Sequence, residues 1–345
     1  MNARRYLNVS FLRIFAFLSV FLFHCFFFTD QGTHEGSPLI LLSVGVQSFL
    51  FLSGFLNSKK DASKASFFMK EIKRIGLPCF YFLIILALID FLVLWASGQP
   101  ITWSSYWWTF GSNDNDGGYI AQFGNLWYIP CLFLCYLSLP LLQGIRKKTK
   151  IKGLGILLVL VIIAEGVFIR FFKEPPFLFP FIAGYLVGSI DFEGEVDPSR
   201  HKNLIWYLLP LTGSALLFLL WMAISPLYPR ASASTQENLG VFFSLTKGAL
   251  GVSLALSFLR AFRWLNAYRE PKVLHDLSNL TFWLYLVNET FMCGCFDLLH
   301  RYSSFPFGIF VTFVATFVSA ATFAFLEKQS KRWQLSPASL RLLYR

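Results

Sequence analysis

Two residues in one apolar segment near the N-terminus, Arg13 and His24, have side chains suited to chemistry on a phosphate-bearing donor. They are eleven positions apart, which at 3.6 residues per turn lies within about 20° of three full turns of an α-helix. Both side chains are therefore expected on one helical face, about 16 Å apart along the axis. Arginine binds phosphate with two parallel hydrogen bonds, and histidine is well matched to proton transfer near neutral pH. The pair predicts a donor whose phosphates lie near Arg13 and whose reactive end reaches His24.

The composition of the chain indicates that this helix lies in a membrane. Hydrophobic residues make up 55% of the sequence and charged residues 14%, in long apolar runs separated by short charged ones. Ionisable side chains are costly inside a bilayer and are functional candidates by default. The ordinary alternative for Arg13 is a charge that extends to the membrane surface and sets the orientation of the helix. An imidazole such as His24 needs a polar partner in an apolar span.

The apolar runs predict an all-α fold, a polytopic transmembrane helical bundle. Taking about 20 residues per span, we expect about ten spans. They are 8–28, 38–56, 76–97, 123–143, 154–172, 177–191, 204–224, 239–261, 278–298 and 305–326. The segment 177–191 is short and contains Pro180, Gly184 and Gly188, which predicts either a broken helix or a deeply buried one. Since no linker or large loop divides the chain, residues 1–345 are expected to form a single membrane domain.

The net charge of +11 is a signal of membrane topology. Lysine and arginine gather before the first predicted span, after the second, fourth, sixth and eighth, and in the C-terminal tail. Cytoplasmic loops accumulate these residues, so both termini are predicted to be cytoplasmic, which requires an even number of spans. We therefore expect a multi-pass protein of the cell membrane, the bacterial plasma membrane, in contact with the lipid bilayer. No nucleic acid partner is expected.

The six cysteines all fall within predicted spans. In such places cysteine behaves as a small buried hydrophobic residue. No disulfide framework is therefore expected. No metal site is predicted either, because a structural zinc ion needs four converging ligands.

The longest predicted extracytoplasmic loop, residues 98–122, combines aromatic side chains with asparagine and aspartate. Trp107 and Trp108 could stack on sugar rings while the polar residues bind hydroxyl groups. The ordinary alternative is a belt of aromatic residues at the membrane interface, followed by a turn rich in Asn, Asp and Gly.

Several short motifs follow one another along the chain. Arg13 and His24 are followed by Gly45-Val46, Phe49 and Ser53-Gly54-Phe55-Leu56, then by the basic stretch 70–78 and by residues 126–140. In this order they resemble the acyltransferase 3 family, integral membrane proteins that move acyl groups, usually acetyl, onto cell-surface glycans and related acceptors. Residues 181–188 and 277–287 resemble later, weaker patterns of that family. The resemblance covers most of the chain.

The resemblance implies roles for particular residues. In the family the first-helix histidine is held to be catalytic and the basic residues to engage coenzyme A, which implies these roles here for His24 and for Arg13 and Arg74. Two positions depart from the pattern. Glu71 stands where many relatives have a second arginine, so donor binding is expected to rest on Lys70, Lys73 and Arg74.

The second departure is Asn288, which stands where relatives often have a histidine. An asparagine can hydrogen-bond an acceptor but cannot move a proton at neutral pH. Any acid–base role at this position is therefore lost or has passed to the adjacent Glu289.

Other ionisable residues lie in predicted spans and are expected to be paired. Glu165 and Arg170 are close enough on one helix to predict a structural ion pair. Glu289 could pair with Lys247 across the bundle. Alternatively, Glu289 could orient His24, as carboxylates do for catalytic histidines.

Together these features predict a membrane O-acetyltransferase. Acetyl-CoA is the expected acyl donor, with no permanently bound cofactor, and the expected acceptor is a hydroxyl of a lipid-linked or cell-surface polysaccharide. His24 would act as general base or carry the acetyl group. Oxyanion charge develops during transfer from a thioester, and Ser53 and Asn288 are candidates to stabilise it. Trp107, Trp108 and Trp127 are candidates to bind the acceptor.

Two other functions agree with the same residues. A glycan or anion transporter or flippase would use the buried charges as a binding site near the middle of the membrane. A catalytically impaired relative would bind donor or glycan without turnover, as Glu71 and Asn288 could imply. The acceptor sugar, an acyl group other than acetyl, and a homodimer are left open.

Overall fold

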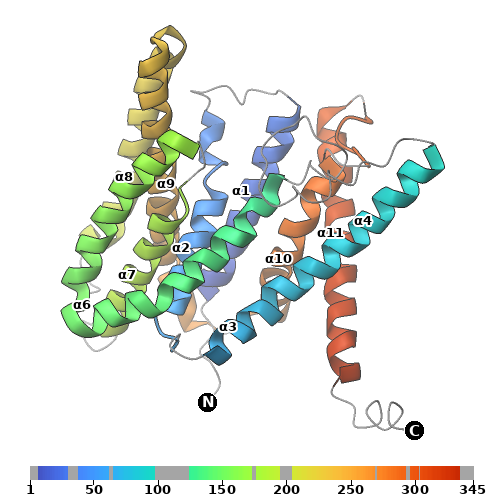
Figure 1. Cartoon of the computed structure of the whole chain (residues 1–345), viewed down its shortest axis with the longest axis horizontal. Helices are drawn as coiled ribbons and strands as arrows, with labels where there is room; N and C mark the ends of the chain where they lie inside the picture. Colours follow the sequence, from blue (N-terminus) through green and yellow to red (C-terminus); the bar gives the residue numbers. More distant parts are fainter. Residues whose placement is uncertain are drawn as a thin grey trace. The chain divides into compact units, whose positions relative to one another are not determined.

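The structure, a computed structural model, is helical throughout its regular elements and contains no strand in the residues that it describes (Figure 1). These residues are 7–29, 38–61, 65–97, 124–172, 176–194, 204–268, 270–292, 296–302 and 304–334. The predicted all-α architecture is therefore confirmed for this part of the chain.

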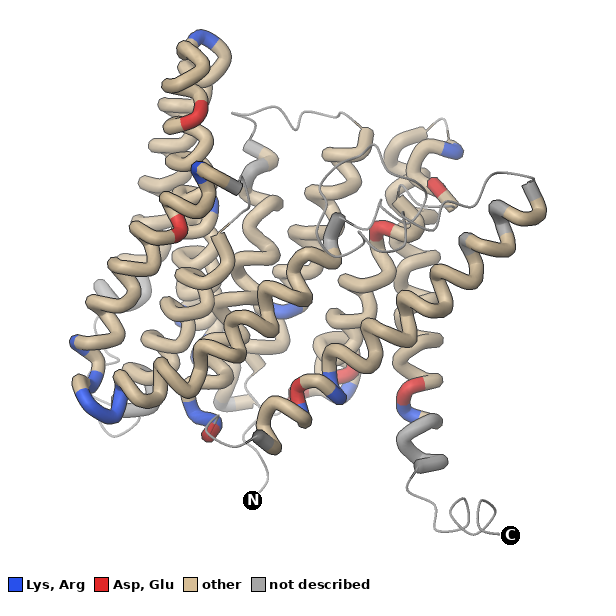
Figure 2. Tube along the Cα trace, viewed as in Figure 1, with Lys and Arg blue, Asp and Glu red and all other residues tan. Residues whose placement is uncertain are grey.

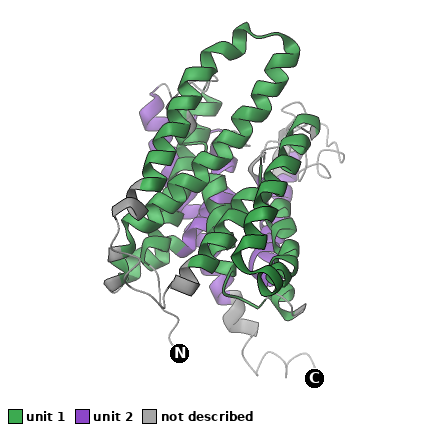
Figure 3. Cartoon of the chain, turned by 90° about the vertical axis from the view of Figure 1, so that its left-hand side faces the viewer, with its two compact units in different colours: residues 1–70, 128–278 green, residues 71–127, 279–345 purple. Residues whose placement is uncertain are grey.

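The chain divides into two compact units, each built from two separate stretches of sequence (Figure 3). Unit 1 comprises residues 1–70 and 128–278, and unit 2 comprises residues 71–127 and 279–345. The main helices of unit 1 are α1 (Leu7–Phe28), α2 (Gly45–Asn57), α3 (Ala65–Glu71, which ends at the boundary), α6 (Tyr128–Phe172), α7 (Leu178–Gly194), α8 (Leu204–Ile224) and α9 (Ala233–Ala261). Short 3₁₀ turns at Pro38–Leu41, Ser225–Arg230 and Arg263–Ala267 complete it.

Unit 2 contains a cluster of packed aromatic side chains. The ring of Trp283 stacks on that of Phe323, with centroids 5.3 Å apart, and its Nε1 donates to Glu327 Oε2 at 3.1 Å. Phe82 meets the same Phe323 ring edge-on at 5.6 Å. The elements of unit 2 are a π-helical turn (Ile72–Gly76), α4 (Leu77–Ser97), a 3₁₀ turn (Gly124–Trp127), most of α10 (Lys272–Met292) and α11 (Phe305–Gln334).

Six helical segments of the described residues are long and apolar enough to cross a membrane. They are Leu7–Phe28, Ser66–Ile89, Tyr128–Phe171, Leu209–Arg230, Ala233–Ala261 and Phe305–Gln329. A shorter apolar helix covers Leu178–Ile190. The multi-pass membrane character is thus supported, while the number of ten spans and the cytoplasmic side of both termini stay predictions.

Two of the predicted spans, 123–143 and 154–172, correspond to the two arms of α6, which begins at Tyr128. This element of 45 residues is interrupted at Lys150, whose φ of 57° and ψ of −147° are not helical. A positive φ is uncommon for a residue with a side chain. The interruption falls in the basic stretch between the two arms, where the sequence predicts a loop.

The interruption of α6 lies beside the end of α2. Arg146 Nη1 donates to the Ser58 carbonyl oxygen at 3.0 Å, and Gln143 Nε2 donates to the carbonyl oxygen of Lys60. The basic stretches after the second and fourth predicted spans therefore lie together within unit 1. Figure 2 shows in blue the lysine and arginine residues around the interruption of α6. The predicted topology places both stretches on one side of the membrane, and this proximity agrees with it.

Helices α2 and α7 contact each other through their backbones. A Cβ atom at Gly54 would overlap the carbonyl oxygen of Phe181, and one at Gly184 would overlap that of Phe51. A Cβ at Gly188 would lie 2.6 Å from the Phe55 carbonyl oxygen. Small residues permit such close approach of membrane helices. α7 is one continuous, buried helix, so of the two predictions for 177–191 the buried helix is correct.

Helices α1, α2 and α9 share a common interface. α2 and α9 run in the same direction, and α1 runs antiparallel to both. The backbone of α2 at Gly45 meets the Ala16 carbonyl oxygen of α1, and Phe15 of α1 stacks on Phe258 of α9 at 4.7 Å. Further along, one buried cluster joins all three helices to α7. Its members are Val9, Leu12, Phe51, Leu52, Ala183, Ala255 and Leu259.

The beginning of α1 is held by polar contacts with the connection between α9 and α10. Asn8 donates from its backbone N to Asn266 Oδ1 at 3.1 Å and from Nδ2 to the Leu259 carbonyl oxygen at 2.8 Å. Ser10 Oγ donates to Glu270 Oε1 at 2.5 Å, and Glu270 Oε2 lies 3.2 Å from His275 Nδ1. Buried polar groups need such partners, so these bonds fix the position of α1.

Glu165 caps the beginning of α7. Its buried carboxylate accepts hydrogen bonds from the backbone N–H groups of Phe177, Leu178 and Phe179, at 2.9, 2.6 and 3.0 Å. A helix N-terminus has N–H groups without intrahelical partners, and a carboxylate satisfies them well. The predicted Glu165–Arg170 ion pair is therefore wrong, and Arg170 Nε instead lies 3.8 Å from Glu237 Oε1.

Replacing Glu165 by alanine is expected to destabilise the protein by about 2–3 kcal/mol, because three buried N–H groups lose their acceptor. Thermal unfolding of the purified protein in detergent checks this. Arg170→Gln is the control, since its ion pair is half-exposed and such pairs contribute about 0–1 kcal/mol. Equal melting temperatures for both variants would contradict the capping role.

Candidate active site

The face of α1 that carries Arg13 and His24 is intact in the structure. α1 is one continuous helix over Leu7–Phe28, so the two half-buried side chains share a face about 16 Å apart. The His24 ring lies between two phenylalanine rings of its own helix. Its centroid is 5.8 Å from that of Phe23 and 5.8 Å from that of Phe28. These rings restrict the orientation of the imidazole.

A basic side chain from α9 reaches the same end of α1. The ammonium of Lys247 lies over the Phe23 ring, 5.3 Å from its centroid. It is close enough to His24 to act on it electrostatically. Cations bind aromatic faces in this way, most strongly where water is excluded. His24 and Lys247 together form the site that we call the histidine end of unit 1.

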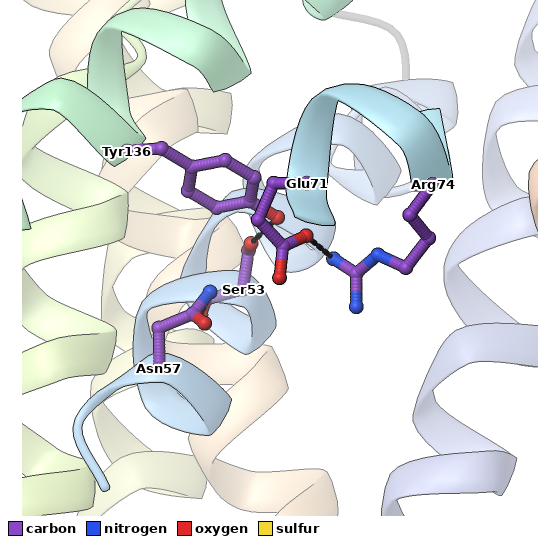
Figure 4. A network of polar contacts seen from close by, with 5 residues as sticks. All are labelled: Ser53, Asn57, Glu71, Arg74 and Tyr136. Carbon is purple, nitrogen blue, oxygen red and sulfur yellow. Dashed lines mark hydrogen bonds and ion pairs between the residues drawn. The ribbon is translucent and has the colours of Figure 1, made fainter. Parts of the chain in front are cut away.

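Polar residues of α2 and α6 gather towards the other end of unit 1 (Figure 4). Ser53 Oγ lies 3.0 Å from the hydroxyl of Tyr136, and Asn57 Nδ2 donates to the Ser53 carbonyl oxygen at 2.9 Å. The Tyr136 ring is fixed between those of Phe67 and Phe181, at 6.1 and 6.2 Å. We call Ser53, Asn57 and Tyr136 the serine cluster.

The serine cluster is at the level of Arg13. The shared core of α1 and α2 contains Leu12, Phe51 and Leu52, the immediate sequence neighbours of Arg13 and Ser53. At 1.5 Å per residue, His24 lies about 18 Å further along α1 than Leu12. Ser53 is therefore too far from His24 to stabilise an oxyanion there, and that expected role does not fit the geometry.

The basic stretch predicted to bind the donor runs from the end of α3 into a π-helical turn of unit 2, which carries Lys73 and Arg74. The guanidinium of Arg74 forms an ion pair with the buried carboxylate of Glu71 (Figure 4). The side chain of Arg74 is half-exposed, and Lys73 is exposed. Lys70, the last residue of unit 1 in this part of the chain, is also exposed. Glu71, the residue that departs from the family pattern, therefore pairs directly with Arg74.

The residues predicted to bind the acceptor are spread over several places. Asn288 and Glu289 are buried in α10, where Asn288 Oδ1 accepts from the backbone N of Glu289 at 2.7 Å. Trp127 is half-buried in unit 2, whereas Trp107 and Trp108 lie outside the described residues. Because Glu289 belongs to unit 2 and His24 to unit 1, the expected contact between them stays a prediction.

Sequence reasoning missed three members of these sites. Tyr136 was part of a recognisable motif, but nothing indicated its contact with Ser53. Asn57 carries no local signal, since it is simply the polar last residue of an apolar helix. Lys247 was visible as a charge in an apolar span, yet its position beside His24 depends on how α9 packs on α1.

The comparison with known proteins covers nearly the whole chain. The family model Acyl_transf_3, described as an acyltransferase domain, matches residues 6–325. The match includes the whole of α1 and residues 305–325 of α11, which ends at Gln334. Neither the curated proteins nor the solved structures give a significant match.

Proposed function

The chain belongs to the acyltransferase 3 family, and from this premise we propose that it is a membrane O-acetyltransferase with acetyl-CoA as its donor. The acceptor would be a hydroxyl group of a lipid-linked or cell-surface polysaccharide. One observation carries the proposal. A single face of α1 bears an arginine and a histidine about 16 Å apart, with the serine cluster at the level of the arginine and Lys247 of α9 beside the histidine.

The donor would bind with its phosphates near Arg13 and the basic stretch, with Lys70, Lys73 and Arg74 in reach of the predicted cytoplasmic surface. Guanidinium groups bind phosphate bidentately. The long pantetheine chain would then pass the serine cluster, where amide and hydroxyl groups can bind its peptide-like bonds. The distance from Arg13 to His24 gives the thioester end a defined destination.

At the histidine end, His24 would take the proton of the acceptor hydroxyl or carry the acetyl group itself. Its place between Phe23 and Phe28 supports either role, because both need a fixed imidazole. Glu289 is a candidate to orient it, and Asn288 to bind the acceptor. Asn288, whose Oδ1 accepts from the Glu289 backbone, would bind the acceptor through its side-chain amide.

Turnover of labelled donor tests the proposal. Purified protein in nanodiscs is given acetyl-CoA with a radiolabelled acetyl group, with and without a membrane extract containing lipid-linked glycans. Release of CoA together with labelled, alkali-labile glycan supports an O-acetyltransferase. Label found on the protein after incubation with donor alone indicates the relay route. Absence of CoA release under all conditions would contradict the acetyl donor.

Replacing Arg13 by methionine is expected to raise the KM for acetyl-CoA by about tenfold, because a charge-assisted bond to phosphate is lost. Arg13→Lys keeps the charge but not the bidentate geometry, so its KM for acetyl-CoA should lie between that of the wild type and that of Arg13→Met. Initial rates at several donor concentrations measure both. An unchanged KM in Arg13→Met would remove Arg13 from the donor site.

A further inference from the structure

Lys247 is a half-buried basic residue in an apolar helix that the proposed roles of the other groups leave unexplained. It lies in the middle of α9, in a segment long and apolar enough to cross a membrane. An ammonium in such a place is costly unless a partner or a ligand compensates it. A negative charge close to the ammonium, either permanent or formed during the reaction, would interact favourably with it.

No permanent charge of this kind is found among the described residues of unit 1. None of their carboxylates forms an ion pair with Lys247, and the contact recorded for the ammonium is the Phe23 ring at 5.3 Å. Glu165, the buried acid on neighbouring α6, has its two oxygens bonded to three backbone N–H groups at the beginning of α7. An aromatic face attracts a cation but does not neutralise it.

The position of the ammonium is close to the proposed site of chemistry. Phe23 and His24 are consecutive residues, with ring centroids 5.8 Å apart, and Lys247 acts electrostatically on His24. The Phe23 ring thus holds the cation on the same turn of α1 that presents the imidazole. The next residue of α9, Gly248, has no side chain, so α9 lies directly against the Phe179 ring of α7.

We propose that Lys247 is a second catalytic group of the transferase, whose ammonium stabilises the oxyanion formed when the acyl thioester is attacked beside His24. This inference rests on the proposed function and assigns a charge to its transition state. It also replaces Ser53, which lies too far along the helix pair for that task.

The step can be written with all bonds accounted for. The acceptor oxygen attacks the thioester carbonyl carbon and a C–O bond forms, while His24 takes the hydroxyl proton. The electron pair of the C=O bond moves to the carbonyl oxygen, which becomes the oxyanion next to Lys247. When the C=O bond re-forms, the C–S bond breaks, and the leaving sulfur of CoA receives the proton from His24. Lys247 keeps its proton throughout.

The variants Lys247→Met and Lys247→Arg distinguish a catalytic role of the Lys247 charge from a structural one. Methionine keeps the apolar stem without the charge, and loss of one preorganised group that stabilises an oxyanion lowers kcat by about 100- to 1,000-fold. We expect such a fall in kcat for Lys247→Met, with the KM for acetyl-CoA changed less than about threefold. Lys247→Arg should recover at least a tenth of the wild-type kcat. Arg170→Met is the control for the loss of one positive charge, because Arg170 is a half-exposed residue of α6 that pairs with Glu237.

Stability supplies an independent readout. If Lys247 were structural, methionine would lower the melting temperature, as loss of one member of a buried ion pair does. For a charge that serves only the transition state, the melting temperature stays equal or rises. The double variant Lys247→Met with Glu289→Gln tests the remaining structural explanation. Recovery of wild-type kcat in this double variant would mean that Lys247 merely neutralises Glu289, and would overturn the proposal.

The outcomes distinguish this inference from the function on which it rests. A wild-type protein that transfers acetyl, together with Lys247→Met at wild-type kcat, overturns the role of Lys247 alone. A wild-type protein that transfers no acyl group from acetyl-CoA overturns both. A fall in kcat with unchanged donor KM and unchanged melting temperature supports both.

Discussion

Replacing His24 by alanine is expected to lower acyl transfer by about 1,000-fold, the largest catalytic effect of any single substitution in this protein. Positioned general acids and bases contribute about 100- to 10,000-fold, and a histidine that carried the acyl group would leave even less residual activity. The change should appear in kcat, because the donor phosphates are proposed to bind about 16 Å away along α1. Release of CoA from labelled acetyl-CoA, followed over time, measures it.

Two further variants separate loss of chemistry from loss of structure. His24→Gln keeps a polar side chain of similar length but cannot transfer a proton, so it should be as inactive as His24→Ala. His300→Ala removes a histidine that is 45% exposed and lies beside Asp297, and it should retain full activity. Substantial transfer by His24→Gln would show that the imidazole only fills space between its phenylalanine neighbours.

Replacing Gly184 by alanine is expected to destabilise unit 1 by about 3 kcal/mol or more. The new Cβ would overlap the Phe51 carbonyl oxygen, so α2 and α7 would have to separate along their whole contact. Gly54→Ala should behave alike, because its Cβ would overlap the Phe181 carbonyl oxygen from the opposite helix. Either variant is expected to melt at a markedly lower temperature and to give less monodisperse protein on size-exclusion chromatography.

The chain provides matched controls for these glycine substitutions. A Cβ at Gly144 in α6 or at Gly240 in α9 would meet no atom within 4 Å. Alanine at either position should be neutral or raise stability by up to about 1 kcal/mol, because alanine favours the helix more than glycine does. If Gly184→Ala melted at the same temperature as Gly144→Ala, the backbone contact between α2 and α7 would be disproved.

The helices were the part of the structure that the sequence predicted well. An apolar run of membrane length must form a helix, since no other open segment satisfies its backbone in lipid. α1 follows this rule, and its continuity puts Arg13 and His24 on one face as their spacing predicts. The interruption of α6 at Lys150 also falls where basic residues predict a loop.

Partnerships between helices were harder to predict, because they depend on packing and not on spacing. The spacing of Glu165 and Arg170 predicts an ion pair, but the carboxylate of Glu165 binds three N–H groups at the beginning of the following helix instead. Its hydroxyl makes Ser53 a candidate to stabilise an oxyanion, but the shared core of α1 and α2 places Ser53 at the height of Leu12, far from His24. Lys247 had no visible neighbour in the sequence that would indicate its place beside Phe23.

Asn8 and Ser10 hold α1 against movement along its own axis. A slip of one turn would displace each residue by about 5.4 Å and break the bonds to Leu259, Asn266 and Glu270, at about 1 kcal/mol each. α1 is therefore not expected to work as a piston. In the proposed reaction His24 would stay at one depth in the membrane, and the thioester and the acceptor hydroxyl would both have to travel to a stationary imidazole.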